Sequence, residues 1–169
     1  MDIKIKEACA ISAANEDMDA FIECFTNAIY DAIGGELNAE NMSQLTVPQI
    51  TLLGYKILRD EVMDGGFVQL IHNGYGGFIF LNPFSKVVRE WGLPDLHKLL
   101  NKCHRLYNKY HDDIEKDCSD EEFMAMFEKY QEFDEFDDIF VENEEEWTGK
   151  VACYIDEHID LFAKIIKDE

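Results

Sequence analysis

The sequence predicts an all-α protein, folded as a single compact helical domain of about six to eight helices. Apolar residues recur at spacings of three and four over most of the chain, which is the period of a helix with one buried face. Glycine pairs interrupt these stretches, as glycines do where helices end. With 47% hydrophobic and 12% aromatic residues among 169, the chain also has the apolar content for a core, which disordered chains lack.

The first half of the chain contains two clear helical stretches. Apolar residues of 17–33 share one helical face, and Gly34–Gly35 follows as a stop. A second helix is predicted to begin after Thr46 as N-cap, with Pro48 in its first turn. Its apolar spacing continues to Gly65–Gly66, where we expect the helix to break.

The middle of the chain contains a short helix and a long one. Residues 67–77 predict a short helix that ends in a glycine-rich turn. Residues 78–81 fit either a short strand or a buried helical or extended segment, and since no partner strand is evident we leave them unassigned. From Pro94 to about residue 114, leucine, tyrosine and cysteine form a helical stripe, which predicts a helix lying across the core.

The last third predicts two more helical stretches. Ser119 followed by Glu122 is a capping box, and apolar positions at helical spacing continue from there to residue 140, with a bend expected near Phe133. A final helix is expected from about 146 to 166. We treat 1–169 as one domain, since a chain of this length is near the usual size of a single domain.

Several features favour a cytoplasmic protein. The first ten residues contain four charged side chains and no apolar run of the length that a secretory signal requires. The longest nearly uncharged stretch, 67–85, contains proline and several glycines, so we expect no membrane-embedded helix. The five cysteines are odd in number and include no Cys-x-x-Cys pair, which favours reduced thiols over a disulfide framework.

The charge of the chain is its most unusual property. Its 36 acidic and 15 basic residues leave a net charge of −21, and the acidic segment 112–146 holds 17 acids against two lysines, a net of −15. Folded as two antiparallel helices, this segment would carry about one net charge per 1.7 Å, the axial spacing of duplex DNA. As one continuous helix it would carry about one per 3.5 Å.

Two interpretations of this segment stay open: a solvated face that keeps the protein soluble, and a rigid array of carboxylates that binds a basic surface. In the second case, Phe133, Phe136, Ile139 and Phe140 are expected to face the core and the acidic side chains to face outward. The partner-binding residues predicted from this arrangement are Asp134, Glu135, Asp137, Asp138, Glu142, Glu144, Glu145 and Glu146.

No catalytic or metal-binding pattern emerges, and we expect neither an enzyme nor a cofactor. None of the five histidines has an acid three residues before it, so the Glu-x-x-His pair of a di-iron bundle is absent. The best EF-hand register has Cys118 in the place of glycine and Met124 in the place of glutamate. The glycines match neither a phosphate-binding loop nor a dinucleotide fingerprint.

One short motif resembles a known family. The stretch Asp60–Leu70, with Gly65, Gly66, Phe67 and Gln69 and followed by Asn73–Gly74, resembles the core motif of the DNA-mimic protein family, small acidic all-helical proteins of bacteria. The resemblance extends from about 47 to 166. It implies an all-helical fold, with the four named residues as structural positions, and for the member that named the family an acidic dimer surface that occupies the DNA-binding face of a transcription regulator.

The function expected from these observations is that of a DNA-mimic-like protein. Its acidic helical surface would bind a basic DNA-binding protein, either a transcription regulator or a nucleoid protein, and compete with DNA. We expect no direct binding of nucleic acid, because the net charge would repel it. The resemblance also allows a homodimer. The alternative is a helical interaction or immunity-type module that neutralises another basic partner without enzymatic activity.

Overall fold

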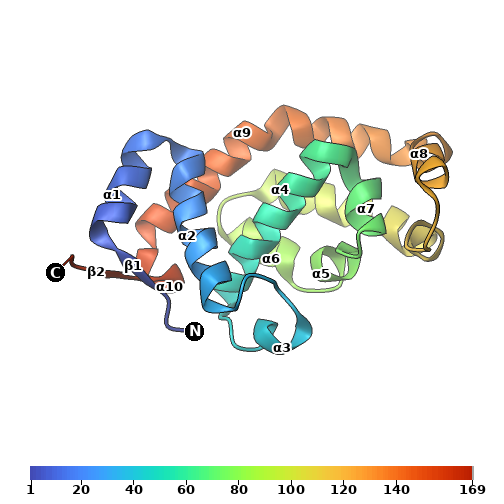
Figure 1. Cartoon of the computed structure of the whole chain (residues 1–169). Helices are drawn as coiled ribbons and strands as arrows, with labels where there is room; N and C mark the ends of the chain where they lie inside the picture. Colours follow the sequence, from blue (N-terminus) through green and yellow to red (C-terminus); the bar gives the residue numbers. More distant parts are fainter. Residues whose placement is uncertain (169) are drawn as a thin grey trace. The chain divides into compact units, whose positions relative to one another are not determined.

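The computed structural model describes residues 1–168, and it confirms the all-α prediction (Figure 1). Within these residues no helix combines the length and the hydropathy needed to cross a membrane. The described elements are two short strands, ten α-helices and one 3-10 helix: β1 (Lys4–Lys6), α1 (Glu7–Glu16), α2 (Met18–Ala32), α3 (Ala39–Met42), α4 (Val47–His72), α5 (Gly76–Phe80), α6 (Phe84–Glu90), α7 (Pro94–Ile114), α8 (Asp120–Lys129), η1 (Gln131–Phe133), α9 (Asp134–Glu157), α10 (Ile159–Phe162) and β2 (Lys164–Ile166).

The chain divides into two compact units. The first unit comprises residues 1–53 together with the residues from 146 onward, and the second unit comprises residues 54–145. Helices α4 and α9 each begin in one unit and end in the other. The proposal of one domain over 1–169 stays a prediction, and its last residue lies outside the described part of the chain.

The first unit joins the two ends of the described chain. Strands β1 and β2 pair in parallel, with Ile5 opposite Ile165. The buried side chain of Gln49 donates hydrogen bonds to the carbonyl oxygens of Met1 at 2.9 Å and Phe162 at 3.0 Å. The strand pairing and the hydrogen bonds of Gln49 all join residues far apart in the sequence. Local periodicity therefore predicts neither strand.

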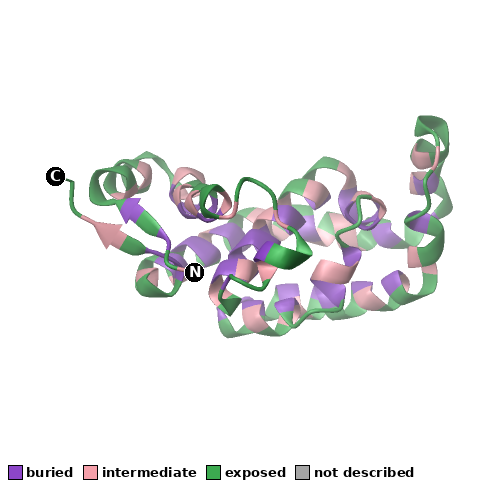
Figure 2. Ribbon diagram, turned by 60° about the horizontal axis from the view of Figure 1, so that its bottom comes forward, coloured by how far each residue is buried: buried purple, intermediate pink, exposed green. Residues whose placement is uncertain are grey.

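Helix α2 confirms the helix predicted over 17–33. Asp17 caps it by accepting a hydrogen bond from the amide of Ala20 at 2.7 Å, and Gly34 and Gly35 follow its end with positive φ. Its apolar face is buried, whereas its other face is exposed, as the burial colours of Figure 2 show along most helices.

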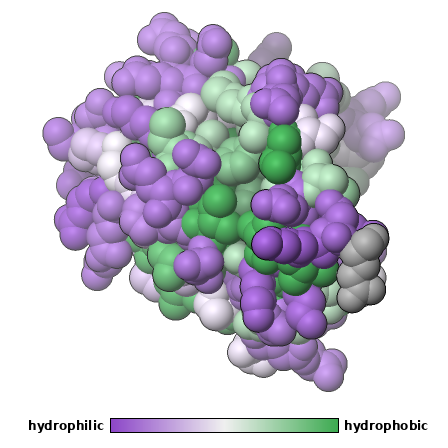
Figure 3. All heavy atoms as spheres, turned by 90° about the vertical axis from the view of Figure 1, so that its left-hand side faces the viewer, coloured by the Kyte–Doolittle hydropathy of each residue, from purple (hydrophilic) through white to green (hydrophobic). Residues whose placement is uncertain are grey.

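On the side of the molecule drawn in Figure 3, hydrophilic side chains surround a hydrophobic patch.

The predicted start and break of the second helix are both present in α4. Thr46 and Gln49 form the capping pair: the Gln49 side chain accepts from the amide of Thr46 at 3.0 Å. Gly65 (φ −149°, ψ 17°) and Gly66 (φ 74°, ψ −173°) leave the helical conformation, and the chain resumes a helix at Phe67. The φ and ψ of Gly66 belong to a region that only glycine adopts readily.

Residues 78–81, which the sequence leaves unassigned, lie in the short helix α5 and the residue that follows it. The ring of Phe80 in α5 stacks on Tyr107 of α7 with 5.0 Å between centroids. Helix α7 has the boundaries predicted from its leucine stripe, and the fully or nearly fully buried side chains of that stripe are Leu96, Leu99, Leu100, Cys103 and Tyr107.

The acidic segment begins at the end of α7 and continues through α8 and η1 into α9. Ser119 caps α8 by accepting from the amide of Glu122 at 3.2 Å, and η1 forms the bend expected near Phe133. The prediction of a final helix over 146–166 is wrong. Helix α9 is continuous from Asp134 to Glu157 because neither a proline nor a glycine pair interrupts that stretch, and 164–166 form a strand because β1 lies beside them.

Candidate functional site

Most carboxylates of the acidic segment 112–146 face solvent. Fifteen of its 17 acidic residues are exposed, and the two that are only partly exposed are Asp137 and Glu144. The expectation that the candidate partner-binding carboxylates lie mainly on the outside therefore fails for these two. The other six are exposed: Asp134, Glu135, Asp138, Glu142, Glu145 and Glu146.

Five of the exposed carboxylates line one side of α9 in the second unit. On an ideal helix successive residues turn by about 100°, which places all five within an arc of roughly 100° and a length of roughly 17 Å. We call this set the acidic face: Asp134, Glu135, Asp138, Glu142 and Glu145. Glu146 continues α9 into the first unit, where its side chain lies 3.4 Å from Lys150.

The apolar side of α9 is less uniformly buried than the sequence predicts. Phe133, the last residue of η1, and Phe140 of α9 are fully buried, and Phe140 meets Phe67 edge to face with 6.4 Å between ring centroids. Phe136 and Ile139 are only partly buried. They line an open groove of about 560 Å³, whose other lining residues are Lys102, Arg105, Leu106, Glu132 and Glu135.

Asp137 is directed toward the glycine break of α4. Its carboxylate accepts a hydrogen bond from the backbone amide of Phe67 at 2.8 Å. Burial raises the pKa of Asp137 to about 7, and the charges of Asp134 and Asp138 add to that rise, whereas the hydrogen bond from Phe67 opposes it. The Asp137 carboxylate therefore makes an internal contact of the second unit and is not part of the acidic face.

Glu144 also makes an internal contact. Its carboxylate lies 2.5 Å from the Nε of Arg59 on α4, and only 13% of the Glu144 side chain is exposed. A carboxylate held in this way by a guanidinium is oriented by the contact. Glu144 is thus a structural ion-pair partner, and the sequence gives no local sign that separates it from its exposed neighbour Glu145.

Side chains pack closely against the two glycines of the motif. The amide of Gln69 donates to Glu61 at 3.0 Å and to Asp64 at 2.9 Å, which joins the two sides of the break. A side chain on Gly65 would collide with the Gln69 amide, and one on Gly66 would collide with the Asp137 carboxylate. Gly66 is therefore required by its backbone angles and by the approach of Asp137, whereas a side chain at Gly65 would force the Gln69 side chain to shift.

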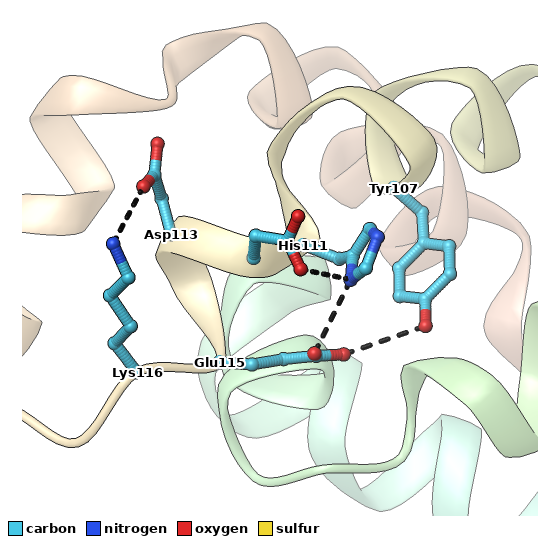
Figure 4. A network of polar contacts seen from close by, with 6 residues as sticks. Tyr107, His111, Asp113, Glu115 and Lys116 are labelled. Atoms are coloured by element: carbon cyan, nitrogen blue, oxygen red, sulfur yellow. Dashed lines mark hydrogen bonds and ion pairs between the residues drawn. The ribbon is translucent and has the colours of Figure 1, made fainter.

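A smaller polar network orders the end of α7 (Figure 4). Glu115 accepts from the hydroxyl of Tyr107 at 3.4 Å and contacts the imidazole of His111 at 3.3 Å. Lys116 pairs with Asp113 at 3.3 Å. Burial, and then the nearby Glu115 charge, raises the pKa of Tyr107. All five residues lie within nine positions of one another, so the network is local to this helix end.

The basic residues of α7 lie beside part of the acidic segment. Lys102 and Arg105 line the groove together with Glu132 and Glu135, an arrangement in which the opposite charges offset one another. Lys109 lies over the ring of Tyr110, with its Nζ 4.9 Å from the centroid. Within residues 1–168, neither Lys102 nor Arg105 forms an ion pair shorter than 4.0 Å.

Comparison with known proteins identifies a family for this chain. Residues 43–158 match the model of the DMP19-like protein family, a range that includes the glycine motif and the acidic face. The chain is also 33% identical over 127 residues to the DNA mimic protein DMP19 of Neisseria meningitidis serogroup B, which covers 75% of this chain and 77% of that protein. The match starts and ends slightly earlier than the predicted 47–166 and confirms the resemblance of the motif. The chain belongs to the DMP19-like protein family.

Proposed function

We propose that this protein is a DNA mimic whose acidic face binds a basic DNA-binding protein, a transcription regulator or a nucleoid protein, and competes with DNA for it. The observation that carries the proposal is the set of five exposed carboxylates on one side of α9, in a chain whose relative is named a DNA mimic protein. The partner class follows from charge complementarity, because a negative array is attracted to the surfaces that bind phosphates.

The spacing of the acidic face supports this reading. Five charges spread over roughly 17 Å are separated by about 4 Å on average along the helix axis, close to the roughly 3.4 Å between phosphates along one strand of duplex DNA. Within the acidic segment 112–146, α8 has ten residues and α9 contributes thirteen, and all five carboxylates of the acidic face lie on α9. The charge spacing of the acidic face therefore resembles the phosphate spacing of a single DNA strand.

Rigidity is the second property that a mimic needs. The acidic face lies on a continuous helix, and the inner side of that helix is held by Asp137 on Phe67 and by Glu144 on Arg59. Carboxylates fixed before binding lose less conformational entropy when a partner docks than those of a flexible acidic tail would. This arrangement favours a specific partner over general attraction to basic proteins.

The test compares two variants with equal changes in charge. In the first, Asp134, Glu135, Asp138, Glu142 and Glu145 become their amides; in the control, five exposed acids of the first unit, Glu16, Glu23, Asp31, Glu36 and Glu40, become theirs. The wild-type protein captures its partner from a cell lysate, and titration of that partner against each variant follows. We expect at least a tenfold loss of affinity for the first variant and near-wild-type affinity for the control.

Competition completes the experiment. Labelled DNA bound to the captured partner should be displaced by the wild-type protein and by the control, and not by the variant of the acidic face. Equal binding by both variants would refute the assignment of the face. A captured partner that does not bind DNA, yet still requires the acidic face, would favour the immunity-type alternative.

A further inference from the structure

Two inward carboxylates of α9 lie seven positions apart and meet α4 on opposite sides of its break. Asp137 accepts from the amide of Phe67, directly after Gly66, whereas Glu144 meets Arg59, which precedes the break. The later residue of α9 thus meets the earlier residue of α4. The two helices run antiparallel at these contacts, and the carboxylates hold α9 to both parts of the broken helix.

Gly66 provides the space that Asp137 occupies. A Cβ at Gly66 would overlap all three atoms of the Asp137 carboxylate, so the missing side chain is what lets the carboxylate approach. The helix that resumes at Phe67 begins with amide groups that have no acceptor within their own helix. Asp137 supplies one from a different element, in the manner of an N-cap.

We propose that Asp137 is a positioning residue whose carboxyl group is a proton-dependent latch, holding the helix that carries the acidic face against the glycine break. The groups around the carboxyl are the amide of Phe67 and the backbone of Gly66 from α4, Cys103 from α7, and Asp134 and Asp138 from α9 itself. Of these, the two aspartates repel a negative charge at Asp137.

The protonated latch is the more stable form. A neutral carboxyl group can still accept the hydrogen bond of Phe67 through its carbonyl oxygen, and the cost of a buried negative charge disappears. Burial raises the pKa of Asp137 from 3.8 to about 7, so between these values the folded protein binds a proton that the unfolded chain does not. Stability from this group is therefore present at low pH and is lost as pH rises toward 7.

The experiment uses the full chain without any partner. Urea unfolding at pH 6 and pH 8 compares the wild type with Asp137→Asn, which keeps the acceptor and removes the charge, and with Asp138→Asn on the exposed side. Between the two pH values the unfolding equilibrium constant of the wild type should rise about tenfold more than that of Asp137→Asn. Asp138→Asn removes one of the two repelling charges, so it should keep a pH dependence of stability and move it to somewhat lower pH.

Carbon-13 NMR of the side-chain carboxyls gives a second readout, with a titration midpoint for Asp137 near neutral pH. A midpoint near 4, or the same pH dependence for the wild type and Asp137→Asn, would overturn the latch. If Asp137→Asn does not fold, the wild-type titration decides alone. Any effect of the latch on partner binding rests on the proposed function, but these measurements do not, so either proposal can fail without the other.

Discussion

Asp137 and Asp138 are adjacent, carry the same side chain and have opposite surroundings. Asp138 is exposed on the acidic face, whereas Asp137 is half-buried and accepts a hydrogen bond from the amide of Phe67. One step along a helix turns the side chain by about 100°, which is enough to separate a candidate binding residue from an internal acceptor. Counting acidic residues in a segment therefore overestimates the charge that a partner can meet.

At the same scale, we predict that Gly66→Ala destabilises the protein more than Gly74→Ala. Both glycines have positive φ, but a Cβ at Gly74 meets nothing within 4 Å, whereas one at Gly66 collides with Asp137. Urea denaturation should show a loss of about 1 to 2 kcal/mol for Gly74→Ala and about 3 kcal/mol or more for Gly66→Ala. Equal losses would show that the contact between Gly66 and Asp137 does not constrain the fold.

Helix α9 is the element that joins stability and the proposed function. Its inner side contributes buried aromatic rings and the two inward carboxylates, and its outer side contributes the acidic face. Like charges along the outer side repel one another, so the packing of the inner side must offset that repulsion. Substitutions on the two sides should accordingly have opposite effects on stability.

At the scale of the element, the pair Glu144→Gln and Glu145→Gln tests this division. Glu144→Gln removes the charge that faces Arg59 and should lower the free energy of unfolding by about 2 kcal/mol at pH 7. Glu145→Gln changes an exposed neighbour and should stay within about 0.5 kcal/mol of the wild type or rise slightly. Urea denaturation measures both. The reverse order would mean that the sides of α9 are wrongly assigned.

For the whole molecule, the net charge of −21 determines which macromolecules can approach it. At low ionic strength the long-range field of such a chain is repulsive toward nucleic acids and attractive toward basic surfaces. Screening shortens the reach of that field to about 10 Å at 0.1 M salt. The basic stripe of α7 is a local exception within this field, and it consists of Lys98, Lys102, Arg105 and Lys109. Of these, Lys102 and Arg105 lie beside Glu132 and Glu135.

We predict that the protein does not bind DNA. Fluorescence anisotropy of a labelled duplex should stay unchanged up to micromolar protein at 0.1 M salt, because the basic stripe of α7 is outweighed by the surrounding carboxylates. The same assay on the captured partner, which should bind the duplex, serves as the positive control. Saturable binding of the duplex by this chain would contradict both the electrostatic argument and the proposed mimicry.

The sequence by itself determined the fold class, the start and break of α4, the limits of α7 and the cap of α8. These features depend on periodicity, capping residues and glycine, which act within a few residues of one another. The family motif and the excess of acid in 112–146 are also readable without coordinates.

Only the tertiary structure decided which carboxylates remain outside. Asp137 and Glu144 turn inward because Phe67 and Arg59, more than 60 residues away, lie where they can meet them. The pairing of β1 with β2 has the same origin, since it joins distant parts of the chain. Local sequence records the propensity of each segment, and long-range contacts then select which face of it is buried.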